Sequence, residues 1–521
     1  MTSPNILVIL NDDMGYSDIG CYGGEIDTPH LDGLARAGLR MTQFYNTARC
    51  CPSRASLLTG LYPHQADVGH MIGNDRVDGY LGDLSRKAVT IAEALKPAGY
   101  ATAMSGKWHV TGHLDAPGNW PCQRGFDEFY GMLCGAGSYF DPHHLKRNDE
   151  AIRLNPGEYF TDTISDEAVA QINRHHERRP DQPLFQYVAY TAPHWPLHAL
   201  PEDIEKYRGR FAEGWDRLRE RRLQRLRAEG LLDPRWDLSP RDPNVLPWEE
   251  APDKAWQQRR MEAYAAQIDR MDQGVGRILD ALRTTGRFED TLILFLSDNG
   301  GCAEGISGDG SRYHSNGRCS GREITRDGQH RVRYGNDPAI VPGPEDTYCS
   351  YGTEWANLSN TPFRKYKVWT HEGGIATPLI AHWPVGNLPA GAIRHQPAQL
   401  PDILPTLLAA AGAPYPQTHQ GHPIQPGEGH SLLPAWRDDL PHAREVLYWE
   451  HEGNAAVRKG PWKLVRDYPG PWELYHVEND RSELHDLAST HPETVADLNA
   501  LWQAWADRCH VLDWNTLRSR R

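Results

Sequence analysis

The feature that most constrains the fold is a repeated pairing of a short apolar run with a polar cluster directly behind it. Residues 6–10 run into Asn11-Asp12-Asp13, and residues 291–296 run into Ser297-Asp298-Asn299. The runs at 100–104 and 184–190 also end in polar segments. Helical patterns separate these runs, which predicts an α/β fold with a sheet covered by helices. Because open α/β sheets place their sites at the carboxyl ends of strands, the polar clusters are candidate functional residues.

The rest of the chain supports two domains. Helices are predicted at 29–37, with Thr28 as cap and Pro29 in the first position, and at 89–98, 165–177 and 256–284. The charged segment 203–260 is interpreted as a solvated helical insertion, and the glycine-rich segment 300–360 as the rim of a pocket. After about residue 436 the pattern changes to short strands at 445–450, 455–458, 462–465 and 473–475, followed by a helix at 491–507. We therefore predict a larger α/β domain at 1–435 and a smaller α+β domain at 436–521.

Composition excludes several classes of protein. The net charge of -14 argues against a nucleic-acid-binding surface, so an anionic substrate would need a local positive pocket. No apolar run is long enough for a membrane span. Nine cysteines without regular spacing do not suggest a disulfide framework. The apolar run at 6–10 is interpreted as a strand rather than a signal peptide, which predicts a cytoplasmic protein unless a leader has been removed.

A cysteine motif gives the most specific signal: Cys50-Cys51-Pro52-Ser53-Arg54, continued by Leu58-Thr59-Gly60. Pro52 suits the first turn of a helix, which puts Cys50 at the N-terminus, where free N–H groups and the helix dipole favour an anion. Arg54 adds a positive fork nearby. The segment resembles the C-x-P-S/T-R signature of the type I sulfatases, particularly the bacterial arylsulfatase-like members, and the resemblance extends over the whole chain.

That resemblance implies a covalent modification. In type I sulfatases a formylglycine-generating enzyme oxidises the first cysteine of the motif to formylglycine. Proline lies two residues after Cys50 but directly after Cys51, so the resemblance assigns the modification to Cys50. It also implies an alkaline-phosphatase-like fold, with a central mixed sheet flanked by helices and a smaller C-terminal domain.

Four oxygen-bearing side chains follow two of the predicted strands: Asp12, Asp13, Asp298 and Asn299. Such a set suits a hard divalent cation, calcium or magnesium, although either pair alone is also typical of a turn or helix cap. The resemblance implies that these four residues and the modified Cys50 bind one calcium ion. Asn299 favours a sulfatase, because the related phosphatases and phosphonate hydrolases tend to have histidine there.

Three further segments match the family. Lys107 and His109 lie in Gly106-Lys107-Trp108-His109, and His194 lies in Ala192-Pro193-His194-Trp195-Pro196. Lys367 corresponds to a lysine that contacts sulfate; Arg364 and Lys365 compete with it chemically, and only the spacing to Glu372 selects Lys367. The remaining histidines are interpreted as surface or structural.

The resemblance also implies the reaction. A hydroxyl of hydrated formylglycine, deprotonated with help from Asp298, attacks sulfur, while calcium, Arg54, Lys107 and Lys367 neutralise the transferring group. His194 protonates the leaving oxygen, and His109 takes the proton whose loss expels sulfate.

Two alternatives stay open at this point. One is a phosphonate monoester or phosphodiester hydrolase on the same scaffold, and the other is a sulfated-ligand-binding protein that is never oxidised. The leaving group (aryl, alkyl or sugar) depends on the loops at 120–150, 195–250 and 300–360, and no sequence pattern indicates the oligomeric state.

Overall fold

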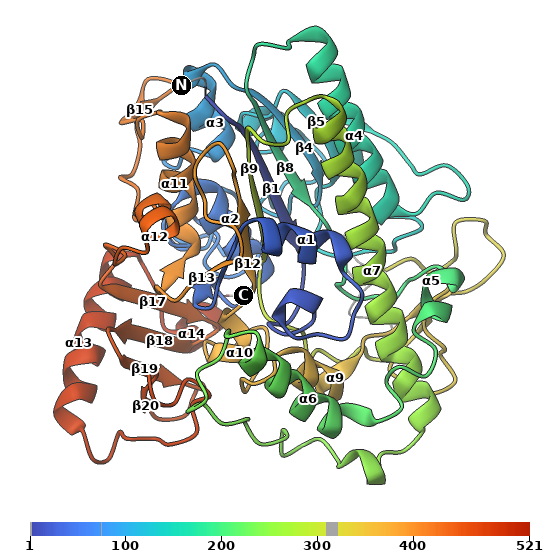
Figure 1. Cartoon of the computed structure of the whole chain (residues 1–521), viewed down its shortest axis with the longest axis vertical. Coiled ribbons are helices and arrows are strands. Elements are labelled where there is room, and N and C mark those ends of the chain that lie inside the picture. Colours follow the sequence, from blue (N-terminus) through green and yellow to red (C-terminus); the bar gives the residue numbers. More distant parts are fainter. Residues whose placement is uncertain (1–2, 74, 309–320, 521) are drawn as a thin grey trace.

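The computed structural model of the chain, which describes residues 3–73, 75–308 and 321–520, is built on a ten-stranded mixed sheet (Figure 1). Five neighbouring strands, β9-β1-β8-β4-β5, run parallel, whereas β12 and β6 run antiparallel to the strands at either end of that group. The mixed α/β architecture predicted from the sequence is therefore confirmed. In sheet order the strands are β13 (Ala392–Arg394), β2 (Leu39–Met41), β12 (Leu379–His382), β9 (Thr291–Ser297), β1 (Asn5–Asn11), β8 (Leu184–Ala189), β4 (Ala101–Gly106), β5 (Glu128–Met132), β6 (Leu145–Arg147) and β7 (Glu150–Ala151).

The parallel register brings the polar clusters together. All seven residues of β1 are buried, as expected for a strand covered on both faces. Asn11 pairs with Ser297, so the segments that follow β1 and β9 leave the sheet side by side. Backbone N–H groups continue the pattern beyond the strands: Asp298 donates to the Asn11 carbonyl at 3.2 Å, and Lys107 donates to the Ala189 carbonyl at 2.7 Å.

Helices cover both faces of the sheet (Figure 1), with α4 and α7 on one side and α3 and α11 on the other. The first predicted helix begins at Pro29 with Thr28 in the N-cap position, but the Thr28 side chain does not cap the helix backbone; its hydroxyl accepts from Gly20 N and donates to Asp32 instead. The helices are α1 (Pro29–Ala37), α2 (Cys50–Thr59), α3 (Ile91–Leu95), α4 (Phe160–Arg178), α5 (Pro201–Lys206), α6 (Gly214–Ala228), α7 (Lys254–Thr284), α9 (Gly352–Ser359), α10 (Glu372–Ile375), α11 (Ile403–Ala411), α12 (Leu433–Asp438), α13 (Pro492–Arg508) and α14 (Trp514–Arg518).

The segment 203–260 is helical only in part: it holds α6 and the adjoining ends of α5 and α7, whereas residues 229–247 form no helix. Its charged face is not simply solvated either. On α6, Arg222 is fully buried and pairs with Asp18 at 2.8 Å and Glu25 at 2.7 Å. Trp215 on the same helix packs edge-on against Trp248 and Trp355. The segment thus fixes the loop behind β1, because buried carboxylates there require a cation. In the segment 300–360, the described residues include β10 (Arg333–Tyr334), β11 (Thr347–Tyr348) and α9, while 309–320 lie outside the described residues.

The C-terminal part forms a four-stranded antiparallel sheet of β17 (Val446–His451), β18 (Asn454–Lys459), β19 (Trp462–Arg466) and β20 (Glu473–His476). Its side chains alternate between two cores, as a strand period of two requires. Val457 and Leu464 pack with Trp502 and Trp505 of α13, whereas neighbouring residues such as Val465 join the main core. Short two-stranded pairs complete the fold: β3 (Phe44–Tyr45) with β14 (Ala398–Gln399), and β15 (Thr418–His419) with β16 (His422–Pro423). The domain boundary at residue 436 stays a prediction.

A buried ion cluster joins this sheet to the larger body. Lys463 Nζ lies 2.9 Å from Glu372 Oε1 and 2.7 Å from Glu483 Oε1, and all three side chains are at most 1% exposed. Arg481 Nε approaches the other oxygen of Glu372 at 2.8 Å. Charges this deeply buried are stable only as pairs, so the two parts of the chain are coupled through α10.

None of the helices within the described ranges is long and apolar enough to cross a membrane. Cys134 is disulfide-bonded, which its spacing to other cysteines did not indicate, whereas Cys50 and Cys51 are free thiols.

Candidate active site

The four predicted metal ligands meet at the carboxyl ends of β1 and β9. Asp12, Asp13, Asp298 and Asn299 are each no more than 1% exposed. Asn299 Nδ2 donates to Asp13 Oδ1 at 2.6 Å, and the backbone N of Asp13 approaches Asp298 Oδ1 at 3.4 Å. Asp13 takes a left-handed conformation with φ of 66°, which turns its side chain into the cluster at a cost in backbone strain.

Three predicted cations neutralise the three carboxylates. Arg54 donates from Nε and Nη2 to Asp298 Oδ2 at 3.0 and 2.8 Å, so two charge-assisted hydrogen bonds converge on one carboxylate oxygen. Lys107 Nζ donates to Asp12 Oδ2, and Lys367 Nζ lies 2.8 Å from Asp13 Oδ1. Burial opposes the charge on Lys367, but the Asp13 carboxylate holds the pKa of that lysine well above its usual range.

The structure separates Lys367 from its two competitors. Arg364 points away and pairs with Glu473, and Lys365 pairs with Asp467 at 2.6 Å. Only Lys367 of the three reaches the carboxylate cluster, as the spacing to Glu372 predicted.

Cys50 is the first residue of α2 and lies beside the cations. Arg49 before it is extended, with φ of -147°, and no side chain caps the helix, so the N-terminal dipole acts on residue 50. A hydrogen bond from Cys51, followed by the charges of Lys107 and Lys367, lowers the pKa of the Cys50 thiol well below its usual range despite burial. Burial raises the pKa of Cys51 instead. The site therefore stabilises a negative charge at position 50 and not at position 51.

The two predicted histidines contact different groups of the cluster. His109 groups with Cys50 and Cys51, their possible ligand atoms all lying within 4.8 Å of one another, and burial lowers the pKa of His109 to about 4. His194 Nε2 lies 3.2 Å from Lys367 Nζ and 3.4 Å from Asp13 Oδ2. His194 Nδ1 lies 2.7 Å from the Trp195 carbonyl, which can only accept, so the proton of the neutral ring belongs on Nδ1.

The donor set fits a hard divalent cation. Asp12 Oδ1 and Asn299 Oδ1 are buried and have no hydrogen-bond partner among the described residues. Burial and the neighbouring Asp12 raise the pKa of Asp298 well above its usual range, so the acids repel one another when ionised. Oxygen ligands of this kind match the preference of calcium and magnesium, and a cation would satisfy the oxygens that lack donors.

A pocket of about 700 Å³ opens beside Lys367. The segments 195–250 and 300–360 contribute to its wall as predicted, through residues such as Asn244 and Glu304, whereas the described residues of 120–150 do not line it. Glu304 was missed: it pairs with Arg49 at 2.8 Å and accepts from Trp195 Nε1 at 3.2 Å. The C-terminal part supplies much of the remaining wall, and no motif indicated it: Glu452, Asn454, Asp467, Tyr468, Pro469, Trp514, Asn515 and Arg518.

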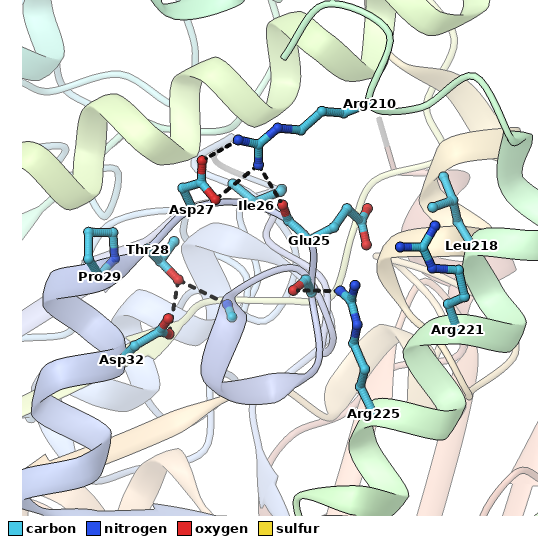
Figure 2. Close-up of a pocket in the computed structure, with 12 residues that line it drawn as sticks. Glu25, Ile26, Asp27, Thr28, Pro29, Asp32, Arg210, Leu218, Arg221 and Arg225 are labelled. Atoms are coloured by element: carbon cyan, nitrogen blue, oxygen red, sulfur yellow. Dashed lines mark hydrogen bonds and ion pairs between the residues drawn. The ribbon is translucent and has the colours of Figure 1, made fainter. Parts of the chain in front are cut away.

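A second pocket of about 660 Å³ lies between the loop before α1 and helix α6 (Figure 2). Two of its arginines already have partners in the pocket wall: Arg210 binds Asp27 at 2.6 Å, and Arg225 donates to the Gly24 carbonyl at 3.2 Å. None of the predicted catalytic or metal-binding residues lines it, so the candidate site is the cluster around Cys50.

The α/β fold thus brings acids, cations and histidines together around Cys50. Residues 4–413 match the Sulfatase family, and residues 363–504 match the N-sulphoglucosamine sulphohydrolase C-terminal family. The chain belongs to the sulfatase family and hydrolyses sulfate esters.

Individual relatives agree with this assignment. An uncharacterised sulfatase of Schizosaccharomyces pombe is 33% identical over 96% of this chain and 92% of its own length. The arylsulfatase of Klebsiella aerogenes is 34% identical over 82% of this chain and 91% of its own length. Among solved structures, Ps i-CgsB in complex with k-i-k-neocarrahexaose superposes with a TM-score of 0.68, at 26% identity over 97% of this chain and 93% of that one. Nothing in these comparisons supports the phosphonate or phosphodiester alternative.

Proposed function

We propose that this sulfatase acts through formylglycine at position 50 and a calcium ion held by Asp12, Asp13, Asp298 and Asn299. The observation that carries the proposal is the charge balance around Cys50, where three buried carboxylates face three buried cations. A divalent ion added to that neutral set leaves an excess of positive charge. Such a site attracts a sulfate monoester in spite of the acidic surface of the protein.

The modified residue and the ion each supply one part of the chemistry. Formylglycine supplies, as its hydrate, a hydroxyl nucleophile, and the cation supplies Lewis-acid stabilisation of charge. We propose that a formylglycine-generating enzyme installs the aldehyde. All other tasks fall to the side chains of this chain.

Arg54, Lys107 and Lys367 orient and neutralise the sulfate oxygens. Each cation is already fixed by a carboxylate, so little reorganisation is needed as charge moves during sulfuryl transfer. Arg54 is further held by the Lys107 carbonyl, which accepts from Nη1 at 2.9 Å.

Lys367 and His194 work as a pair at the leaving group. Because the neutral His194 ring carries its proton on Nδ1, its Nε2 accepts from the Lys367 ammonium. The proton for the departing oxygen therefore comes from the pair and not from His194 alone. His109 lies close to residue 50, where a neutral imidazole can take a proton in the step that releases sulfate.

The pocket suggests the class of leaving group. Trp369, Tyr468 and Trp514 offer aromatic surface, while Glu452 and Arg518 offer charge and hydrogen bonds. A pocket of about 700 Å³ is the size that holds a drug-sized molecule. We propose an aryl or sugar sulfate of one or two rings as the substrate.

A substrate panel tests the proposal. Protein whose mass is about 18 Da below that of the unmodified chain carries the oxidised cysteine, and only such protein should be assayed. Aryl, alkyl and sugar sulfates should be compared with phosphodiesters of matched leaving group. Faster turnover of the phosphodiesters, or turnover of sulfates by unmodified protein, would contradict the proposal.

A further inference from the structure

We propose that His70, His451 and Glu452 form a second metal site, suited to zinc, in the wall of the substrate pocket. His70 follows α2 in the chain, while His451 ends β17 and Glu452 begins the turn to β18. The possible ligand atoms of the three residues all lie within 4.8 Å of one another. None of them belongs to the Cys50 cluster, so this site is independent of the proposed calcium site.

The distances suit tetrahedral coordination. Glu452 Oε1 lies 2.9 Å from His70 Nε2 and 3.7 Å from His451 Nε2. Ligand atoms about 2.0–2.1 Å from a tetrahedral zinc ion are about 3.3 Å apart, and the two distances lie on either side of that value. The two imidazole rings are stacked with an interplanar angle of 8°, so their edges can face the same point.

His451 is buried without hydrogen-bond partners in the described part of the chain. Its side chain is fully buried, and neither ring nitrogen has a hydrogen-bond partner among the described residues. Burying a polar ring without partners is costly, and a metal on Nε2 would remove part of that cost. Burial lowers the pKa of His451 to about 3, so the ring is neutral and has a lone pair available.

The third ligand leaves a route to the ion. The Glu452 side chain is 30% exposed and lines the pocket together with Trp514 and Asn454. Three protein ligands with an open fourth position are typical of zinc that binds a water or a ligand, whereas structural zinc is closed by four. The His70 carbonyl accepts from the Cys51 thiol at 3.6 Å, which places the site next to the reacting residue. The open position would therefore bind an oxygen atom of the substrate's leaving group.

Metal content tests the proposal directly. Full-length protein is stripped with a chelator, returned to an excess of Ca²⁺, and titrated with Zn²⁺ while bound metal and the melting temperature are measured. We expect one equivalent of zinc in addition to calcium, with a rise in the melting temperature. H451Q and E452Q should each lose the zinc equivalent and the rise, and their calcium content should not change.

H382Q is the matched control. His382 is also buried, its Nδ1 lacks a hydrogen-bond partner among the described residues, and it packs against Phe288. Its replacement should leave zinc binding intact. If H451Q does not fold, E452Q carries the test, because its side chain is partly exposed. No zinc in the wild type under excess Ca²⁺, or full zinc in E452Q, would overturn the proposal.

Discussion

Replacing Lys463 by Met should destabilise the protein by about 3 kcal/mol at neutral pH. Lys463 lies 2.9 Å from Glu372 and 2.7 Å from Glu483, and methionine would fill the space without the charge. Removing one partner of a buried ion pair costs about 3–5 kcal/mol, because the remaining charge has no compensation. Arg481 stays within 2.8 Å of Glu372, so the lower end of that range applies.

The pH dependence makes this prediction sharper. Although burial opposes it, Lys463 and Arg481 lower the pKa of Glu372 to about 2. A depressed carboxyl pKa stabilises the folded state above the unfolded pKa of about 4.3, and that stabilisation is lost as the pH falls toward 2. In K463M the pKa of Glu372 should rise. Glu372 then becomes protonated at a higher pH than in the wild type, which removes the uncompensated charge. The difference in free energy of unfolding between wild type and K463M should then be smaller at pH 5 than at pH 7.

Urea unfolding at both pH values measures these free energies. K365M is the control: Lys365 pairs with Asp467 at 2.6 Å, but the two side chains are 28% and 39% exposed, so its loss should cost about 0–1 kcal/mol. The reasoning is refuted if K463M costs no more than K365M, or if its cost is the same at pH 5 and pH 7.

Three further predictions concern the site. Cys50→Ala should abolish turnover without lowering the melting temperature, and Cys51→Ala should keep most activity; the opposite result would move the modification to Cys51. Chelating the metal should lower both activity and melting temperature, because the clustered acids repel one another without a cation. Full activity in protein that elemental analysis shows to be metal-free would contradict the calcium assignment. With oxidised enzyme and an aryl sulfate, His109→Ala should release one equivalent of phenol in a burst and gain about 80 Da on the peptide carrying residue 50. His194→Ala should lose most activity on poorly leaving alcohols; an adduct in this variant and none in His109→Ala would reverse the two roles.

The sequence was most informative where local pattern and sheet geometry act together. The run before Asp12 became β1 and the run before Asp298 became β9, and their parallel register alone brings the two clusters together. The fold class and the sulfatase family are therefore readable from these strand ends and the Cys50 motif. The roles of the individual site residues stay predictions, although the structure does place them in one cluster.

Features that depend on contacts between residues far apart in the sequence could not be predicted from the sequence. The charge run of α6 looked solvated because the carboxylates that bury Arg222 lie about 200 residues earlier in the chain. His451 looked like any other histidine, since its closeness to His70 arises only when the end of β17 packs against the segment after α2 that carries His70. The pocket wall from Asp467 to Arg518 carries no motif, because its residues come together only when the C-terminal part packs beside Lys367.

The last seventy residues line much of the pocket, so the proposed sulfate-binding residues and the proposed substrate-selecting residues lie in different parts of the chain. The groups proposed to bind sulfate lie between residues 12 and 367, while Glu452, Tyr468 and Trp514 line the pocket proposed for the rest of the substrate. Substitutions in the C-terminal segment can therefore change which substrates the enzyme accepts without changing the reaction that cleaves the sulfate ester. Exchanging the segment after residue 445 between related enzymes offers a way to graft a new preference onto unchanged chemistry, provided that the Lys463–Glu372 contact is kept.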